Sequence, residues 1–446
     1  MGKELVFQTL RHEKTSAVAW VPFAGVHAGK LKGYSAEEVL MDGDKLFDSL
    51  MEVKKLYSPD GMPIVFDLQI EAEILGCELL WAKSNPPSVK THPLAGSEYK
   101  IPCKCKIPTK ESGRIPMILD VMRRVKAEIG DTTALYGLVC GPFTLASHLR
   151  GSDIFMDMIM NEQYVRDLVE FCSEVCMRMI DYYAETGMDV IAVVDPLVSQ
   201  ISPEHFTAML NPSFTACFDY IKSKSLFSSF FVCGNATLQL EVMCHTHPDC
   251  ISVDENVDIV KGKTITDKYG ITIAGNIPLT TVMLHGNQQD NRKCVVDLLD
   301  SIDHHNFILS PGCDMPYDVP IENTIAAMQA VKAGLEAVLV ERRTFLGREI
   351  SAYGRGWLEG TPSAGASWRQ LLPFGADPAL PDTVPKAYRT AAPLFIGAVR
   401  KNLLRRLLDA DVKVLLQSDA VGLAEAQGRA AGLLLAACAP FQRGEP

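Results

Sequence analysis

The chain has 446 residues, and 47% of them carry hydrophobic side chains, so it can bury a large core and does not have the composition of a disordered polymer. Its 43 Lys and Arg against 54 Asp and Glu give a formal net charge of -11, which argues against a role on nucleic acid or on an anionic membrane surface. A small molecule or a protein is the expected partner.

Cysteine usage and the first residues indicate the cellular compartment. Thirteen cysteines in 446 residues fall far below the density of a disulfide scaffold, and residues 1–14 contain no apolar core of a secretory signal. The apolar segment 430–438 has about half of the roughly 20 residues that a membrane-spanning helix needs. We therefore expect a cytoplasmic protein with reduced thiols and no membrane segment.

Short apolar runs alternate with helical stretches along the first three quarters of the chain. Near-continuous apolar runs are typical of strands buried on both faces, and stretches with helical spacing, such as 161–186 and 322–339, follow most of them. The eight runs are 18–25, 63–68, 134–141, 189–196, 228–234, 250–256, 271–276 and 307–313. This count predicts a (β/α)8 TIM barrel, and the missing G-x-G-x-x-G after the first strand argues against a doubly wound sheet.

Polar side chains follow each predicted strand. Because active-site groups collect at the carboxyl ends of barrel strands, we expect these side chains to meet at one rim. In chain order they are His27, Asp67, Glu71, Cys140, Asp195, Cys233, Asn235, Asp254, Asn276 and Cys313. Cys233 and Cys313 each stand just past a buried strand, and we expect this pair to form the centre of the site.

The composition changes near residue 341. Residues 1–341 contain 21 Lys and 8 Arg, whereas residues 342–446 contain 3 Lys, 11 Arg and no His. We therefore predict a barrel over 1–341 and a separate tail over 342–446, rich in Ala, Arg and Gly. A Gly- and Pro-rich linker is expected at 354–385, and amphipathic helices at 391–408 and 418–438. No chemical motif indicates what the tail does.

Several ordered motifs point to a known family. They are Tyr136-Gly-Leu-Val-Cys-Gly-Pro-Phe-Thr-Leu-Ala146, Gly187-Met-Asp-Val-Ile191 with Asp195-Pro196, Cys233-Gly-Asn235, Gly275-Asn-Ile-Pro278, Ser310-Pro-Gly-Cys-Asp-Met-Pro316 and Pro320-Ile-Glu-Asn323. This set resembles the uroporphyrinogen decarboxylase superfamily. The resemblance is greatest to its corrinoid-dependent methyltransferase branch, the methylcobamide:coenzyme M methyltransferases and related demethylases. It covers roughly residues 1–341.

The resemblance implies a (β/α)8 barrel of the uroporphyrinogen decarboxylase type and a zinc site. In that branch a His-x-Cys at one strand end and a Cys in an S-P-G-C-like turn hold the zinc. The two cysteines fall on Cys233 and Cys313, but Phe231 stands at the histidine position. Because a catalytic zinc usually has three protein ligands, we expect Glu71 and His27 to complete the site.

The implied chemistry is methyl transfer to or from a cobalt corrinoid. Zinc would turn a thiol into a thiolate or activate a leaving group, and a carboxyl group would orient the substrate or pass a proton. The expected catalytic side chains are Asp195, Asp254 and Glu71. The expected substrate contacts are His27, Asp67, Cys140, Asn235 and Asn276.

The cobalt must come from elsewhere. The corrinoid-binding signature D-x-H-x-x-G is not matched, because Asp303-His304-His305 is followed by Ile308 where glycine should stand. We therefore expect a methyltransferase that works with cobalamin on a separate corrinoid protein. The small substrate, a methyl ether, a methylamine or a thiol, the direction of transfer and a homodimeric assembly stay open.

Two alternatives remain. Uroporphyrinogen decarboxylase itself begins with an Arg-Gln-Ala-Gly-Arg-Tyr-like stretch that grips substrate carboxylates, whereas residues 23–30 read Phe-Ala-Gly-Val-His-Ala-Gly-Lys and lack both arginines. The second alternative is a non-catalytic binding barrel that lost the metal site together with the histidine. Substitution of both cysteines would leave such a protein unaffected.

Overall fold

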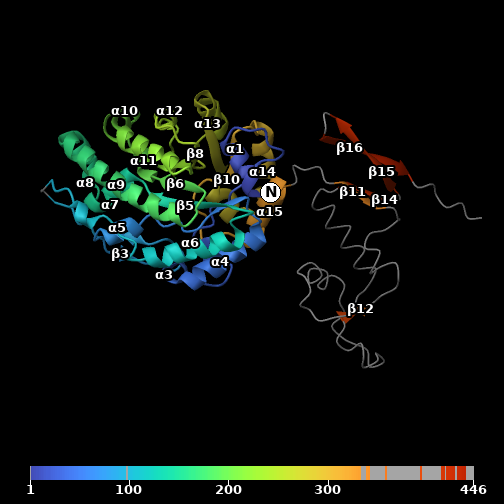
Figure 1. Cartoon of the computed structure of the whole chain (residues 1–446), viewed down its shortest axis with the longest axis horizontal. Helices are drawn as coiled ribbons and strands as arrows, with labels where there is room; N and C mark the ends of the chain where they lie inside the picture. The colour runs from blue at the N-terminus through green and yellow to red at the C-terminus, as the bar shows by residue number, and fades with distance from the viewer. Residues whose placement is uncertain are drawn as a thin grey trace, which may run out of the picture. The chain divides into compact units, whose positions relative to one another are not determined.

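The computed structural model describes residues 2–96 and 99–332 with their side chains, and six short strands beyond them (Figure 1). The chain divides into two compact units, Met1–Lys332 and Ala333–Pro446. The first unit carries every residue that the sequence places in the candidate site. The predicted domain boundary after residue 341 stays a prediction.

The first unit is built around an eight-stranded parallel sheet in the order β1-β10-β9-β8-β7-β6-β5-β2. Its strands are β1 (Ala19–Trp20), β2 (Gly61–Pro63), β5 (Ala134–Cys140), β6 (Val190–Val194), β7 (Phe227–Val232), β8 (Cys250–Val253), β9 (Thr272–Ile277) and β10 (Phe307–Pro311). Each predicted strand overlaps one of these, although β2 begins and ends earlier than expected. The predicted barrel of parallel strands and helices is confirmed.

Asp60 joins the two end strands of this sheet. The backbone N–H of Trp20 donates to Asp60 Oδ2 at 3.0 Å, and the backbone N–H of Asp60 donates to the carbonyl of Trp20 at 2.9 Å. The carbonyl of Asp60 in turn accepts from the N–H of Ala134 at 2.9 Å. These bonds close the barrel between β1 and β2, where the strands are too short to form a ladder.

Eight helices surround the strands (Figure 1). They are α4 (Gly43–Tyr57), α6 (Ile115–Ile129), α9 (Glu162–Glu185), α11 (Asn211–Ser223), α12 (Leu240–Cys244), α13 (Ile259–Thr266), α14 (Gln288–Ser301) and α15 (Ile321–Lys332). Helix α9 confirms the helix predicted at 161–186, whereas α15 ends before residue 339. Among the described residues, no helix is long and apolar enough to cross a membrane.

Further elements fill the connections. They are α1 (Gly2–Leu10), α2 (His27–Lys30), α3 (Ala36–Met41), α5 (Ile70–Ile74), β3 (Leu79–Leu80), β4 (Ser88–Val89), η1 (Lys104–Lys106), α7 (Pro142–Arg150), α8 (Asp153–Met160), η2 (Pro196–Gln200), α10 (Pro203–His205), η3 (Phe206–Leu210), η4 (Asp267–Tyr269) and η5 (Leu279–Leu284). Most of them lie between the carboxyl end of a strand and the next large helix. They therefore build the rim on which the candidate site stands.

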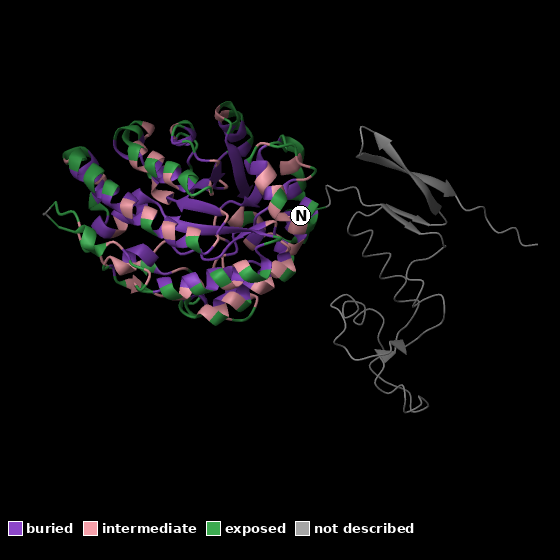
Figure 2. Cartoon of the chain, viewed as in Figure 1, coloured by how far each residue is buried: buried purple, intermediate pink, exposed green. Residues whose placement is uncertain are grey.

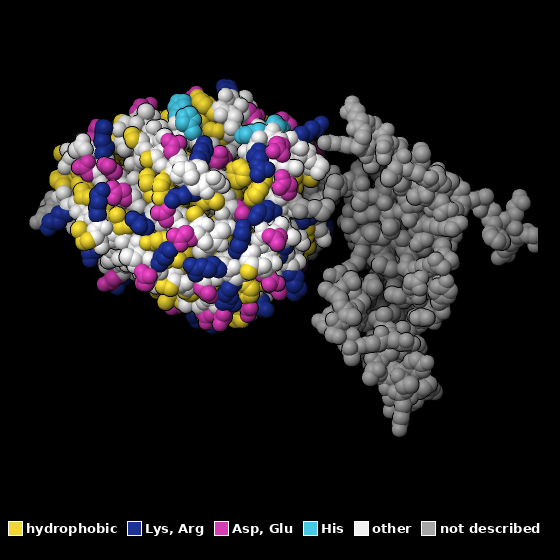
Figure 3. Space-filling model, viewed as in Figure 1, with side chains coloured by type: hydrophobic (Ala, Val, Ile, Leu, Met, Phe, Trp, Pro, Cys, Tyr) yellow, Lys and Arg dark blue, Asp and Glu magenta, His cyan; other side chains and the backbone are white. Residues whose placement is uncertain are grey.

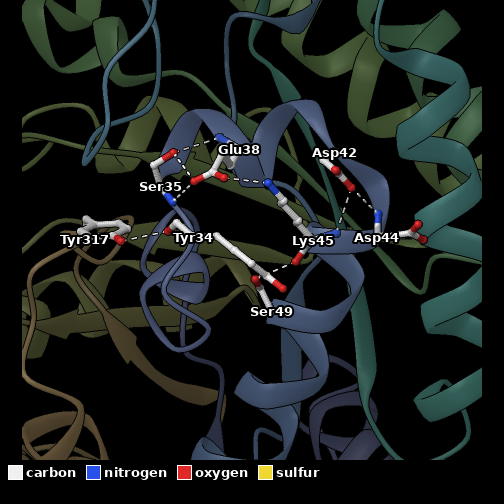
Figure 4. Close-up of polar contacts among 8 residues, drawn as sticks. All are labelled: Tyr34, Ser35, Glu38, Asp42, Asp44, Lys45, Ser49 and Tyr317. Carbon is white, nitrogen blue, oxygen red and sulfur yellow. Dashed lines mark hydrogen bonds and ion pairs between the residues drawn. The ribbon is translucent and has the colours of Figure 1, made fainter.

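A polar network fixes the connection after β1 (Figure 4). Ser35 and Glu38 form a capping box at the start of α3, and Glu38 also binds Lys45 at 2.7 Å. Asp42 caps α4 by accepting from the next turn. The hydroxyl of Tyr317 donates to the carbonyl of Tyr34 at 2.9 Å, so the segment after β10 is tied to this connection.

Side chains alternate between two cores along each strand. In β7, Phe230 faces the helices and packs against Phe214 and Phe218 at centroid distances of 4.8 and 5.3 Å. Phe231 faces the barrel interior, where α1 contributes Val6 and Leu10 to the same cluster. Figure 2 shows the strands buried beneath partly exposed helices. Helices cover the outside of the barrel and α1 packs at one end, and the carboxyl-terminal rim with its connecting segments forms the other end.

The second unit differs from the sequence prediction. Strands β11 (Val338–Glu341) and β14 (Lys413–Leu416) pair in parallel, and β15 (Ser418–Ala426) and β16 (Arg429–Ala437) form an antiparallel pair. A strand pair therefore stands where the sequence predicts a helix at 418–438. Gly422 and Gly432 lower the helical propensity there, and residues 433–437 have no polar side chain for an amphipathic face. The helix predicted at 391–408 lies outside the described residues, apart from β13 (Ala392–Pro393), which pairs with β12 (Trp357–Leu358).

Asp60→Ala should destabilise the protein, because it removes the carboxylate that accepts from Trp20 at the seam of the barrel. We expect the free energy of unfolding in urea to fall by about 1–3 kcal/mol. Asp44→Ala is the control, since the Asp44 side chain is 86% exposed and should change stability by about 0.5 kcal/mol or less. Equal losses in both variants would contradict a closing role for Asp60.

Candidate active site

The ends of β7 and β10 bring Cys233 and Cys313 together. Their Cα atoms lie 6.0 Å apart and their sulfur atoms form a disulfide, although 80 residues separate them in sequence. The expectation of reduced thiols therefore differs from the structure at this pair. The composition of the chain could not indicate the bond, because it depends on the barrel placing two distant strand ends side by side.

An aromatic floor, defined here as Phe23, Phe66 and Phe231, lies in the barrel interior next to the two cysteines. The ring centroid of Phe231 lies 4.9 Å from that of Phe23 and 5.8 Å from that of Phe66. All three rings are buried, and Cys233 and Cys313 pack against the cluster that contains them. A ligand held at the two sulfur atoms would therefore have phenyl rings on the side of the barrel interior.

His27 is fully buried and both of its ring nitrogens are occupied. Nε2 lies 2.7 Å from the hydroxyl of Tyr57, and Nδ1 lies 3.0 Å from the carbonyl oxygen of Tyr317. Burial lowers the pKa of His27 to about 4, so the ring is neutral at pH 7. Its hydrogen bonds tie α2 to α4 and to the segment after β10, and leave no nitrogen lone pair directed to the cysteines.

Glu71 is also buried, at the point where β2 and β5 diverge. Its Oε1 accepts from the backbone N–H of Cys140 at 3.2 Å, and Oε2 is buried without a hydrogen-bond partner. Burial raises the pKa of Glu71 to about 8, and the neighbouring Asp67 adds to this rise. The side chain therefore holds a proton at neutral pH and extends the β2–β5 contact beyond the end of β2.

The expected zinc shell is not assembled among the residues that the structure describes. No group of three or more His, Cys, Asp or Glu side chains in this part of the chain could hold a metal ion. Phe231 fills the expected histidine position with an apolar ring, and His27 and Glu71 have other partners. Two cysteines alone fall short of the three protein ligands of a catalytic zinc, so the residues present do not fit that metal.

Asp67 forms an ion pair at the rim. Its Oδ2 accepts from Arg114 Nη1 at 2.6 Å, and its Oδ1 accepts from the backbone N–H of Gln69 at 2.9 Å. Arg114 also donates to Glu73 through Nε at 2.9 Å. Asp67, expected to contact the substrate, is thus held by the arginine that precedes α6.

Asp195 caps helix α7. Its carboxylate accepts from the backbone N–H groups of Phe143 and Thr144 at 2.9 and 3.1 Å, and from the Thr144 hydroxyl at 2.6 Å. Burial raises the pKa of Asp195 to about 6, although these hydrogen bonds oppose the rise. Both carboxylate oxygens of this expected catalytic group therefore accept hydrogen bonds from the start of α7.

Asp254, Asn235 and Asn276 make local contacts where their strands end. Asp254 Oδ1 accepts from the backbone N–H of Asn256 at 2.9 Å, and Asn235 Oδ1 accepts from the Thr237 hydroxyl at 2.6 Å. Asn276 Nδ2 donates to the carbonyls of Asp254 and Val257 at 3.0 and 2.7 Å. Asn276 thereby ties β9 to the turn that follows β8.

Cys140 is fully buried at the end of β5. Its carbonyl accepts from the Cys176 thiol at 2.9 Å, and burial raises the pKa of the Cys140 thiol well above its ordinary value. A thiol in this setting stays protonated and unreactive at neutral pH. Its contacts are those of a packed side chain between β5 and α9.

Asp314 is a residue that the sequence places at the rim, at the end of the eighth predicted strand, without assigning it a role. It follows Cys313 directly, its Oδ1 is buried without a hydrogen-bond partner, and burial raises its pKa well above the ordinary value. A Cβ at Gly25 would lie 1.7 Å from this oxygen, and Gly25 has a φ of +36°. The charged residue beside Cys313 and the glycine after β1 were the available signals, but their contact depends on barrel closure.

Comparison with known proteins identifies the family to which this barrel belongs. The family model described as uroporphyrinogen decarboxylase (URO-D) matches residues 1–334. The chain belongs to the URO-D family. Its match ends close to the end of α15, so the strands β11 to β16 lie outside the URO-D barrel.

The relatives that the chain matches include proteins named as methyltransferases and proteins named as decarboxylases. The chain is 27% identical over 337 residues to "Methylcobamide:CoM methyltransferase MtbA" of Methanosarcina acetivorans. The match covers 74% of this chain and 97% of the relative. It is 25% identical over 305 residues to the uroporphyrinogen decarboxylase of a Wolbachia species, covering 66% and 84%. A solved methyltransferase from Methanosarcina mazei has a TM-score of 0.67 at 22% identity, covering 74% and 98%, and shares the fold.

Glu71→Gln should change how stability depends on pH. The folded URO-D barrel holds a proton on Glu71 up to about pH 8, whereas the unfolded chain releases it near 4.5, so ionisation destabilises the wild type as pH rises through this window. Glutamine has no proton to lose. The free energy of unfolding of the variant should therefore rise relative to that of the wild type as pH increases. We expect this difference to grow by up to roughly 1.4 kcal/mol per pH unit between about pH 5 and 8.

Urea unfolding at several pH values measures this difference. Asp67, Arg114 and Cys140 face Glu71 in both proteins, so their contribution largely cancels. Glu37→Gln, an exposed change on α3, is the control for removal of one carboxyl group. A constant difference between Glu71→Gln and the wild type across the window would contradict the raised pKa.

Gly25→Ala should destabilise the URO-D barrel more than Gly33→Ala. Both glycines have positive φ, +36° and +78°, but only the Cβ at Gly25 would clash with Asp314, whereas nothing lies within 4 Å of a Cβ at Gly33. We expect the control Gly33→Ala to lose about 1 kcal/mol of unfolding free energy and Gly25→Ala about 2–4 kcal/mol. Urea unfolding compares the two, and equal losses would show that Asp314 moves freely.

Proposed function

We propose that the protein is a methyltransferase that moves a methyl group between a small substrate and cobalamin carried by a separate corrinoid protein. The observation that carries the proposal is the meeting of Cys233 and Cys313 at the ends of β7 and β10 in a URO-D barrel. Relatives named methylcobamide:CoM methyltransferases, which match nearly their whole length, support the same reaction class.

The proposed reaction uses the cysteine pair in its reduced state. When a methyl group leaves an oxygen or nitrogen for Co(I), the leaving atom gains electron density and must take up a proton, and the cobalt becomes methyl-Co(III). A thiol beside the leaving atom can supply that proton, and in the reverse direction a thiolate can accept one. The disulfide form has neither a proton nor a thiolate, so it is inactive in this scheme.

The residues of the chain also indicate which metal and cofactor take part in the proposed reaction. The proposal contains no step through zinc, because Cys233 and Cys313 are two ligands and His27 and Glu71 are bound elsewhere. It requires cobalamin from a partner, since Asp303-His304-His305 does not complete a corrinoid-binding signature. The small substrate then lies between the thiol pair and the incoming cobalt. Location in the cytoplasm and assembly as a homodimer stay predictions.

Decarboxylation of uroporphyrinogen is less well supported. That substrate carries many carboxylates, which require cationic groups around the pocket, and residues 23–30 provide Lys30 but no arginine. Lys30 Nζ donates to the carbonyls of Asp318 and Val319 at 2.8 and 3.2 Å. Turnover of a porphyrinogen by the pure protein would overturn the proposed methyl transfer.

Methyl transfer to free cob(I)alamin under strongly reducing conditions tests the proposal. We expect the full-length protein to form methylcob(III)alamin from a methyl donor, followed by its visible absorbance. The double variant Cys233→Ala/Cys313→Ala should lower kcat/KM by about 100-fold or more, because it removes both thiols that can supply the proton.

Cys217→Ala is the matched control, because this buried thiol lies on α11, outside the barrel interior. Its activity should stay close to that of the wild type. Wild-type activity in the double variant Cys233→Ala/Cys313→Ala would contradict the proposal and favour a barrel whose cysteines serve structure only. Elemental analysis of the same samples checks the ligand argument, since about one zinc per chain that is lost in Cys233→Ala would require a different ligand set.

A further inference from the structure

Cys103 and Cys105 lie on either side of Lys104 in the connection between β4 and α6. Both cysteines are exposed, whereas every other free cysteine that the structure describes is buried or partly buried. Cys103 stands just before the short 3₁₀ helix η1, and Cys105 lies within it. Among the described free thiols, these two are therefore the ones that a dissolved reagent reaches most readily.

Hydrogen bonds join the two cysteines and make them chemically different. Sγ of Cys103 accepts from the backbone N–H of Cys105 at 3.2 Å, and the two side chains are also hydrogen-bonded to each other. The side-chain hydrogen bond from Cys105, its backbone N–H and the charge of Lys106 lower the pKa of Cys103. The same side-chain hydrogen bond raises the pKa of Cys105. Cys103 is thus the member of the pair that ionises first, and the thiolate is the nucleophilic form of cysteine.

Contacts with α9 hold this segment on the surface. Lys104 forms an ion pair with Glu174, and the Tyr182 hydroxyl donates to the carbonyl of Pro108 at 3.0 Å. Because α9 is one of the helices outside the strands, the exposed cysteine pair lies on the outside of the barrel. The disulfide-bonded cysteines of the candidate site instead pack against the interior cluster.

Other free cysteines of the barrel are in settings that suppress reaction. Burial raises the pKa of Cys77 to about 11 and the pKa values of Cys244 and Cys250 to about 12. Cys294 on α14 is only partly buried, yet burial raises the pKa of its thiol as well. Such thiols stay protonated at neutral pH, so the fold itself sets Cys103 apart as a nucleophile.

We propose that Cys103 and Cys105 form a redox-active dithiol that exchanges with low-molecular-weight disulfides, with Cys103 as the attacking thiol and Cys105 as the resolving thiol. The Cys103 thiolate attacks one sulfur atom of the small disulfide, whose S–S bond breaks, and the first small thiolate leaves and takes up a proton. Cys105 then loses its proton to solvent and attacks the Cys103 sulfur, which releases the second small thiolate. Two protein thiols are thereby oxidised to one disulfide bond, and one small disulfide is reduced to two thiols. This site is independent of the proposed methyl transfer.

Mass spectrometry of the full-length protein tests the assignment. The reduced protein is mixed with 2-hydroxyethyl disulfide, an uncharged probe, and quenched with acid at several times. A protease that cleaves after glutamate leaves residues 99–111 in one peptide, which contains both cysteines. We expect a disulfide between Cys103 and Cys105, formed at least about tenfold faster than Cys294 is modified. Equal or faster modification of Cys294 would overturn the proposal.

Substitutions of the two cysteines separate their roles. Cys105→Ser should react with the probe as fast as the wild type but stop at a mixed disulfide on Cys103, because no resolving thiol remains. Cys103→Ser should react about tenfold more slowly, since the remaining thiol has the raised pKa. Cys294→Ser is the matched control and should behave as the wild type. A wild-type rate in Cys103→Ser would overturn the assignment of Cys103 as the attacking thiol.

Alkylation by iodoacetamide tests the hydrogen bond between the side chains. A serine hydroxyl at position 105 can still donate to Cys103 Sγ, whereas alanine cannot. We therefore expect Cys103 to react about threefold more slowly in Cys105→Ala than in Cys105→Ser. Equal rates in the two variants would overturn the activating role of Cys105. Urea unfolding checks that these surface variants are folded.

Discussion

A barrel of parallel strands directs every strand end to one rim, and this constraint organises the whole site. Side chains that follow β1, β2, β5 to β10 in sequence can meet only because the eight strands share a direction and the sheet is closed. The closure depends on the short seam at Asp60, where a side chain and two backbone groups replace the missing ladder. Cys233 and Cys313 meet across the rim as a result.

Many polar side chains at this rim form hydrogen bonds to backbone N–H and C=O groups. Strand ends and helix starts leave N–H and C=O groups unpaired, and in a buried setting each needs a partner. Asp195 supplies three hydrogen bonds to the start of α7, and Asn276 binds two carbonyls after β8. Glu71 binds a backbone N–H beyond the end of β2. Among the rim groups that the structure describes, Asp314 Oδ1 and Glu71 Oε2 are buried without a hydrogen-bond partner, and the cysteine pair is joined by its disulfide. The surface shows mixed charges over the helices, as Figure 3 shows, so no large single-sign patch competes with the rim as a site on that face.

The fold could be predicted from the sequence because its strands are long apolar runs with polar ends. Period and length are local properties, and β1, β5, β6, β8 and β10 lie inside the predicted runs. The start of β2 was missed because Gly61 and Pro63 are poor strand formers, and barrel closure overrides that propensity. The strand pair at β15 and β16 was missed for a related reason, since its alanines favour a helix locally.

The candidate site could be predicted only in its centre. The pairing of Cys233 with Cys313 follows from barrel topology and two turn motifs. The partners of His27 do not, because Tyr57 and Tyr317 reach it from distant segments. The contact of Gly25 with Asp314 likewise joins the first and last strand ends, and no local pattern carries it. Sequence spacing identifies what stands at a rim but not which of its atoms are already bonded.

The state of the cysteine pair links the fold to the proposed chemistry. A Cα separation of 6.0 Å brings both sulfur atoms to one point, so a substrate atom placed there would meet two thiols at once in the reduced protein. The phenyl rings of Phe23, Phe66 and Phe231 lie beneath that point, and they can neither bind a metal nor hydrogen-bond to a charged group. Methyl transfer as proposed would leave little charge behind, because a thiol supplies the proton that the leaving atom takes up. Phe231, at the position where the resemblance leads us to expect a histidine, offers no metal ligand to the cysteine pair and places an apolar ring beside it.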